Sequence, residues 1–208
     1  LDEAVGTAGA LTRRRSRTPL IAALALIAIA AAAFAFALAS GGDGDDETAA
    51  PVVETGPVGA GPVGVAVGDQ RIWVASRDAG ELGRLRRDSP VPAKPPIPLP
   101  EPRAVAVGLG SVWVVNGESL YKVDPDEGKP TEIEVGDGPA DVDVDNQHVW
   151  VANEDDDTVT RIDPFGVDPT ETIEVGGEPH AIDSDDGSVW VATPGDGTIE
   201  RISAAEAR

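Results

Sequence analysis

Four tryptophans divide most of this chain into segments of nearly equal length. Trp73, Trp113, Trp150 and Trp190 are the only tryptophans in the sequence, and successive ones are 40, 37 and 40 residues apart. Each has isoleucine or valine before it and valine after it. A fixed period of about 40 residues indicates a repeat architecture, in which each repeat is one supersecondary unit that buries its apolar face against its neighbours.

The residues around each tryptophan predict short β-strands. A proline stands eleven residues before every tryptophan, and a short, largely apolar run follows it. A turn, the tryptophan run, a polar loop and a third run come next, and two repeats add a fourth run, at 131–135 and 172–175. Alternating or β-branched runs bounded by Gly, Pro, Asp and Asn are typical of strands. Because four such strands per repeat make one propeller blade, we predict an all-β fold, a β-propeller of four-stranded blades over residues 58–208.

The repeat also resembles a known family. Residues 135–139 read Val-Gly-Asp-Gly-Pro, residues 149–153 read Val-Trp-Val-Ala-Asn, and residues 159–164 read Val-Thr-Arg-Ile-Asp-Pro. Over residues 52–203 this pattern resembles the YVTN/NHL-type β-propeller repeat. The resemblance implies the propeller fold, which serves as a binding platform, as a sensor and in some proteins as an enzyme, so the fold by itself leaves the function open.

A long apolar run lies near the N-terminus. Residues 20–39 are all apolar, which is long enough to cross a bilayer as a helix. An arginine-rich segment precedes this run, and an acidic segment rich in Gly and Pro follows it. Because positive charge stays on the cytoplasmic side, we predict a cytoplasmic tail at 1–19, a transmembrane helix at 20–39, a tether at 40–57 and an extracytoplasmic propeller anchored in the cell membrane. A cleaved signal peptide is the alternative, since residues 37–39 fit a small-residue cleavage site.

The order of these segments resembles actinobacterial receptor-type proteins. The resemblance implies that the propeller is the sensing or scaffolding part of a longer protein, with a kinase or a transcriptional regulator upstream. We therefore expect a module that binds an extracytoplasmic ligand or protein, rather than an enzyme. An inert wall repeat is a further alternative.

Charge and cysteine content narrow the classes of partner. The formal net charge is −21, and the chain has no cysteine. A surface this acidic repels nucleic acid and anionic lipid headgroups, so we expect no nucleic-acid partner for this region. Without cysteine, neither disulfides nor thiolate metal sites are available.

The number of blades in the ring stays open in the sequence. The last repeat has three predicted strands and lacks a fourth, while residues 52–54 form a short β-branched run before the first repeat. A strand from the start of the chain that completes the last blade closes a ring and removes exposed sheet edges. The sequence fits either a closed ring of four blades, with 52–54 as the closing strand, or an arc of a larger ring.

Two sets of residues are predicted to lie at the same end of the propeller. The position after the repeated proline is ionisable in two repeats, where it is Arg103 and His180. The position three residues past the tryptophan is small and polar in all four repeats, where it is Ser76, Asn116, Asn153 and Thr193. In a propeller, the loops that lead into a blade and the loops between its second and third strands share one face. We predict that these six residues line a ligand-binding face.

Two chemical alternatives rest on fewer residues. The repeat is similar to virginiamycin B lyase-like propellers, which implies general acid–base catalysis by His and Glu; Glu178 and His180 are the one matching pair, and a second histidine is missing. Asp143 and Asp183 lie on first strands, which line the channel of a propeller, so their carboxylates are candidate ligands for calcium or magnesium. Apart from these, we expect no cofactor.

Overall fold

The computed structural model describes residues 53–166, 169–185 and 187–203. Every regular element in these ranges is a β-strand, which confirms the predicted all-β fold. The predicted tail at 1–19, the predicted transmembrane helix at 20–39 and the tether up to residue 52 lie outside the described residues. Within the described ranges, no helix is long and apolar enough to span a bilayer.

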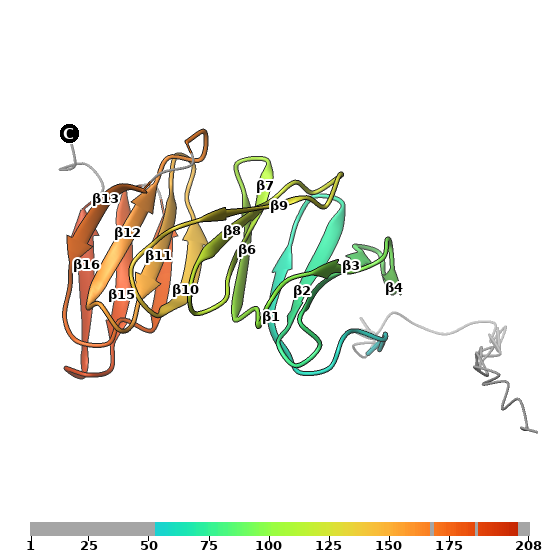
Figure 1. The fold of residues 1–208 in the computed structure, drawn as a ribbon, viewed down its shortest axis with the longest axis horizontal. Coiled ribbons are helices and arrows are strands. Elements are labelled where there is room, and N and C mark those ends of the chain that lie inside the picture. Colours follow the sequence, from blue (N-terminus) through green and yellow to red (C-terminus); the bar gives the residue numbers. More distant parts are fainter. Residues whose placement is uncertain (1–52, 167–168, 186, 204–208) are drawn as a thin grey trace, which may run out of the picture. The chain divides into compact units, whose positions relative to one another are not determined.

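The strands form four antiparallel sheets that follow one another in chain order (Figure 1), and we call them the first to the fourth blade. The first blade contains β1 (Pro62–Val67), β2 (Arg71–Ser76), β3 (Glu81–Arg86) and β4 (Ser89–Pro92), and β5 (Ile97–Pro98) also pairs with β3. The second blade contains β6 (Ala104–Gly108), β7 (Ser111–Val115), β8 (Leu120–Val123) and β9 (Pro130–Ile133). The third blade contains β10 (Pro139–Val144), β11 (Val149–Asn153), β12 (Thr158–Ile162) and β13 (Pro169–Glu174). The fourth blade contains β14 (Ala181–Asp185), β15 (Ser188–Thr193) and β16 (Thr198–Ser203).

The outermost strands agree with the sequence in three blades and differ in one. The predicted fourth strands of the second and third blades correspond to β9 and β13, and the fourth blade has three strands in the described residues. The first blade adds β4 and β5 in a proline-rich segment where the sequence predicts no strand. Proline is tolerated at such positions because the outer side of an edge strand needs no ladder donor.

The tryptophans lie on the second strand of each blade and form the core between blades. Trp73, Trp113 and Trp150 are buried. Each packs against the second strand of the next blade, and the partners are Val112 and Val114 for Trp73, Val149 and Val151 for Trp113, and Val189 and Val191 for Trp150. The large ring fills the space between neighbouring sheets. The repeat therefore specifies one apolar junction three times.

The first strands lie side by side, where the blades approach one another most closely. Strand β6 contacts both β1 and β10, and β10 also contacts β14. A Cβ placed on Gly108 would lie 2.4 Å from Cγ1 of Val144 on the next first strand. Close approach of the strands accounts for glycine there, and for alanine at neighbouring inner positions.

The row of blades is open between the fourth blade and the first. Trp190 is 43% exposed, unlike its three equivalents, and the two end blades lie at opposite ends of the row (Figure 1). The proposed closing strand is not formed by the residues that the structure describes there: Val53 and Glu54 belong to no strand, and Val53 is 86% exposed. Val53 and Glu54 do not pair with β16, because β16 lies at the other end of the row of blades. The row is therefore open in the described residues, and the number of blades in the ring stays a prediction.

Candidate binding face

Two kinds of loop meet at one end of the blades. The loops that lead into first strands (59–61, 99–103, 136–138 and 176–180) lie beside the loops after second strands (77–80, 116–119, 154–157 and 194–197), and we call this surface the loop face. Backbone bonds join the two loops of a blade: the N–H of Arg77 donates to the carbonyl of Gly61 at 2.8 Å, and the N–H of Glu154 donates to the carbonyl of Gly138 at 2.9 Å. The face is thus held by the scaffold of the sheets.

The residue before each repeated proline has a left-handed backbone. Its φ is 64° at Gly61, 39° at Glu101, 65° at Gly138 and 57° at Glu178. Glycine adopts this conformation without steric cost, whereas a residue with a Cβ is strained by roughly 1–2 kcal/mol. The second and fourth blades therefore hold a strained glutamate where the first and third blades hold glycine. Strain of this kind is concentrated at functional sites.

Arg103 and His180 follow these strained glutamates by two residues, and both side chains are exposed at the loop face. Nδ1 of His180 lies 3.4 Å from Oε2 of Glu154 in the neighbouring blade, an ion pair when the imidazole is protonated. The guanidinium of Arg103 covers Gly117, where an added Cβ would lie 2.7 Å from the arginine Cζ. Two basic groups are thus presented at the same position of alternate blades.

The four small polar residues of the predicted face are buried. Ser76, Asn116, Asn153 and Thr193 lie at or just after the ends of second strands. Oδ1 of Asn116 accepts the N–H of Ser119 at 2.8 Å, and Nδ2 of Asn153 donates to Oγ1 of Thr160 at 2.8 Å. The hydroxyl of Thr193 donates to the carbonyl of Thr198 and also forms a hydrogen bond with the hydroxyl of Thr198. Of the six residues, Arg103 and His180 are the ones whose side chains a ligand reaches.

Glu178 and His180, the pair of residues that the lyase resemblance names, make different contacts in the structure. The backbone N–H of Glu178 donates to Oδ1 of Asp157 at 2.8 Å, while its side chain is exposed. Glu154 supplies the carboxylate beside the imidazole instead. Because Glu154 comes from the loop of another blade, the spacing along the chain gives no indication of this contact.

Two aspartates of β10 bridge two blades, and one of them is the candidate metal ligand Asp143. Oδ2 of Asp143 on β10 accepts the N–H of Ser184 on β14 at 2.7 Å and also the hydroxyl of Ser184. Oδ2 of Asp141 accepts the N–H of Ile182 at 3.0 Å, and burial raises the pKa of the Asp141 carboxyl despite this bond. Asp183 is exposed, and no cluster of three metal-ligating side chains occurs in the described part of the chain. The bonds of Asp141 and Asp143 join β10 to β14.

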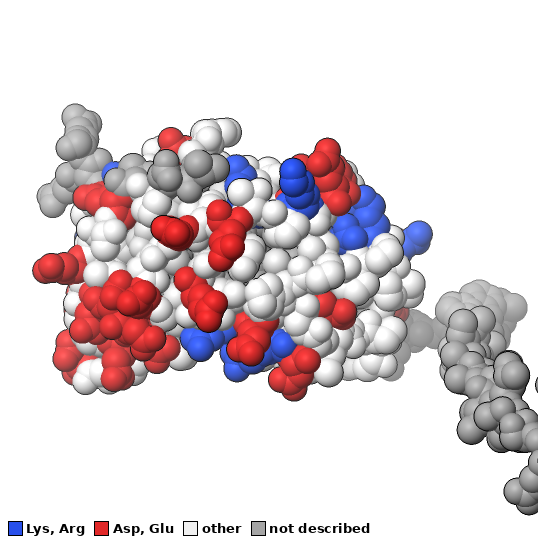
Figure 2. Space-filling model, in the orientation of Figure 1, with Lys and Arg blue, Asp and Glu red and all other residues white. Residues whose placement is uncertain are grey.

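In the third and fourth blades, an acidic residue six positions after the tryptophan holds the incoming loop. Oδ2 of Asp156 accepts the N–H of Asp137 at 2.7 Å, and Oδ2 of Asp196 accepts the N–H of Gly177 at 2.8 Å. Figure 2 shows acidic side chains gathered over the last two blades. The sequence predicts no role for these carboxylates, although an acid stands five or six positions after every tryptophan. That regularity is the signal that identifies them.

The sequence matches no protein-family model, and no curated protein matches it significantly. Solved structures do match. The chain is similar to the computationally designed Ika4 protein, with a TM-score of 0.61 and 12% identity over 69% of this chain and 91% of that one. It is similar to apo AztD from Citrobacter koseri, with a TM-score of 0.57 and 19% identity over 75% of this chain and 47% of AztD. It is also similar to a putative 6-phosphogluconolactonase from Bacteroides uniformis, with a TM-score of 0.57 and 12% identity over 68% of this chain and 50% of that one.

These neighbours have β-propeller-like folds, and the four sheets correspond to propeller blades. The fold is β-propeller-like. The chain spans about half the length of the AztD and lactonase structures. At these identities the likeness extends to the fold alone, so the activity of each neighbour belongs to that neighbour.

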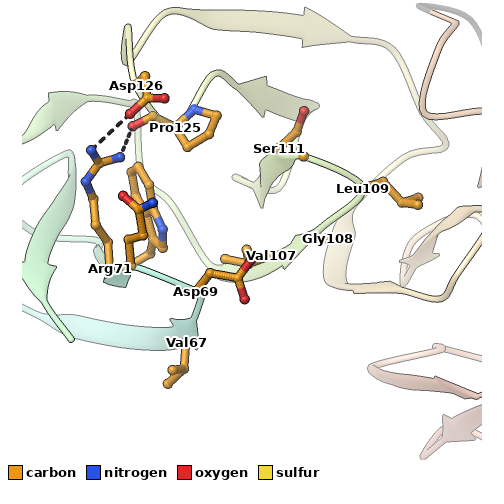
Figure 3. Close-up of a pocket in the computed structure, with 13 residues that line it drawn as sticks. Val67, Asp69, Arg71, Val107, Gly108, Leu109, Ser111, Pro125 and Asp126 are labelled. Carbon is orange, nitrogen blue, oxygen red and sulfur yellow. Dashed lines mark hydrogen bonds and ion pairs between the residues drawn. The ribbon is translucent and has the colours of Figure 1, made fainter. Parts of the chain in front are cut away.

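A pocket lies at the end of the propeller opposite the loop face (Figure 3). It has a volume of about 350 Å³ and lies between the turn after β1, the turn after β6 and the loop after β8. The guanidinium of Arg71 spans the junction of two blades, because it donates to the carbonyl of Pro125 at 2.6 Å and to Oδ1 of Asp126 at 3.0 Å. The repeat pattern does not predict this pocket. Its signal is that Arg71 begins a tryptophan strand where the other repeats have Ser or His.

Proposed function

We propose that this propeller is a binding module whose ligand or protein partner docks on the loop face at Arg103 and His180. The observation that carries the proposal is the left-handed glutamate two residues before each of them, at Glu101 and Glu178. Glycine would relieve the strain, as it does in the other two blades. A glutamate at this strained position supports a role for its side chain, because the side chain is exposed and contributes little to packing.

The charges of the loop face favour a particular class of partner. Glu154 lies beside His180, Glu101 and Glu178 lie on the loops that lead to Arg103 and His180, and further carboxylates lie on the loops of the third and fourth blades. A field of this sign attracts cationic groups and repels anionic ones. A protein segment with mixed or positive charge fits this face, because its own acids can pair with Arg103 while its basic groups meet the carboxylates.

In the full protein we assign this module to the outside of the cell, as the sensor or scaffold of a single-pass membrane protein. The apolar run at 20–39 and the arginines before it support this topology. The tether would let the propeller meet an extracytoplasmic partner, while the helix couples it to the cytoplasmic side.

Site-specific photo-crosslinking tests the proposed face. A photoreactive residue replaces Arg103 or His180 in the full chain, in cells that produce it, and Asp69 at the opposite end of the first blade is the matched exposed control position. We expect positions 103 and 180 to capture the same partner, with no such adduct from position 69. Adducts from position 69 alone, or none from the loop face, would refute the proposal.

A further inference from the structure

The fourth blade ends in an apolar face that none of the other described blades covers. Trp190 is 43% exposed and Ile199 is 67% exposed. The equivalent residues of the third blade, Trp150 and Val159, are buried because the fourth blade packs over them. The outward surface of the fourth blade is therefore one half of the junction that is complete three times within the chain.

The first blade presents the other half of this junction. On the first strand of the first blade, Val65 is 66% exposed and Val67 is 61% exposed. On the equivalent first strand of the fourth blade, Ile182 is buried against the third blade. Val65 and Ile182 hold the same position of the repeat, eight residues before the tryptophan. Each pairs with the valine that follows the tryptophan of its own blade. The two exposed faces are thus the partners of one repeated interface, with the register already set by three internal copies.

Charge also differs between the two ends. Residues 53–103 contain seven Lys or Arg and six Asp or Glu, whereas residues 104–203 contain four Lys or Arg and twenty-four Asp or Glu. In Figure 2 the basic groups at the upper right lie toward the first blade, and the densest acidic region lies over the third and fourth. Contact between the acidic fourth blade of one copy and the arginine-bearing first blade of another is therefore favoured by charge complementarity, with little electrostatic repulsion.

We propose that the occupant of both faces is a second copy of this chain, joined head to tail. At one junction, Trp190 on β15 of the first copy packs against β1 and β2 of the second copy. At the other junction, Trp190 of the second copy packs against β1 and β2 of the first. Two copies of four blades then close a ring of eight, which lies within the range of propellers. Closure by rotation makes both junctions equal and leaves no free apolar face.

The absence of cysteine makes disulfide capture a clean test. Two differently tagged full chains are produced in the same cells and purified in detergent. One carries Val65→Cys and the other carries Ile199→Cys. We expect the mixed disulfide to form faster than either homodisulfide. The internal equivalent, Val159→Cys with Ile182→Cys in a single chain, is the geometric control, and Phe165→Cys, at an exposed site away from both faces, measures random collision.

Three results would overturn the second-copy proposal. Equal capture by Phe165→Cys would identify the disulfide as collisional. Rapid formation of a disulfide within one chain that carries both Val65→Cys and Ile199→Cys would show closure without a partner. Sedimentation of the unmodified full chain as a monomer at micromolar concentration would exclude the dimer directly, whereas we expect a dimer whose mass is halved by Ile199→Lys with an unchanged far-UV circular dichroism spectrum.

Discussion

Replacing Glu178 by glycine is expected to stabilise the propeller. Its φ of 57° places a Cβ-bearing residue in the left-handed region, at a cost of roughly 1–2 kcal/mol. Glycine removes that cost but adds about 0.5–1 kcal/mol of chain entropy to be lost on folding. The backbone bond from residue 178 to Asp157 survives, because it uses the N–H. The expected net gain is about 0.5–1 kcal/mol, or roughly 1–4 °C in Tm for a unit of this size.

Urea unfolding followed by tryptophan fluorescence measures this change, with thermal unfolding as a second readout. Gly138→Ala is the matched opposite substitution at the same position of the third blade. Its φ is 65°, and a Cβ there would lie 2.5 Å from Oδ2 of Asp155, so we expect a loss of about 1–3 kcal/mol. If Glu178→Gly lowered the unfolding free energy, or if both variants changed it in the same direction, the explanation by backbone strain would be refuted.

Three further predictions concern the core, a turn and a buried acid. Trp150→Ala should cost roughly 3–5 kcal/mol in urea unfolding, and Trp190→Ala about half of that in the monomeric Ile199→Lys background; equal losses would contradict the open row of blades. Asn116→Ala should cost about 1–3 kcal/mol in thermal unfolding, because the buried turn loses its acceptor. The raised pKa of Asp141 means that the folded state holds the carboxyl proton more tightly than the unfolded state does. The stability of the protein relative to the Asp141→Asn variant should therefore fall as the pH rises from 3.8 through the raised pKa. A stability difference that stays constant between pH 3.5 and 7 would contradict this prediction.

The fold could be predicted because its information is local and repeated. Each tryptophan run is a β-branched strand with a turn on either side, and four copies at one spacing leave little choice of architecture. The proline-rich β4 and β5 were missed because propensity argues against proline in strands, whereas an edge position tolerates it. The sequence leaves open whether residues 52–54 close the ring, because that pairing joins the two ends of the repeat region and the spacing within a repeat carries no information on it; Val53 and Glu54 belong to no strand.

The candidate site was only partly accessible from the sequence, because its contacts cross between blades. The spacing of the repeats predicts Arg103 and His180 at one end of the propeller, where both are exposed. It did not distinguish them from Asn153, whose side chain folds back into its own hairpin. The contact between His180 and Glu154 joins residues 26 positions apart in different blades. Spacing within one repeat carries no information on such pairs.

Coverage of each tryptophan by the next blade is measured most directly by exchange of the indole N–H protons. In the Ile199→Lys variant, which leaves the fourth blade uncovered, we expect slow exchange at Trp113, bonded to the carbonyl of Gly108, and at Trp150, bonded to Asp145. Trp190 should exchange orders of magnitude faster, because it is 43% exposed. Equally slow exchange at Trp190 would show that its face is covered within one chain, and fast exchange at all three would contradict the stacked blades themselves.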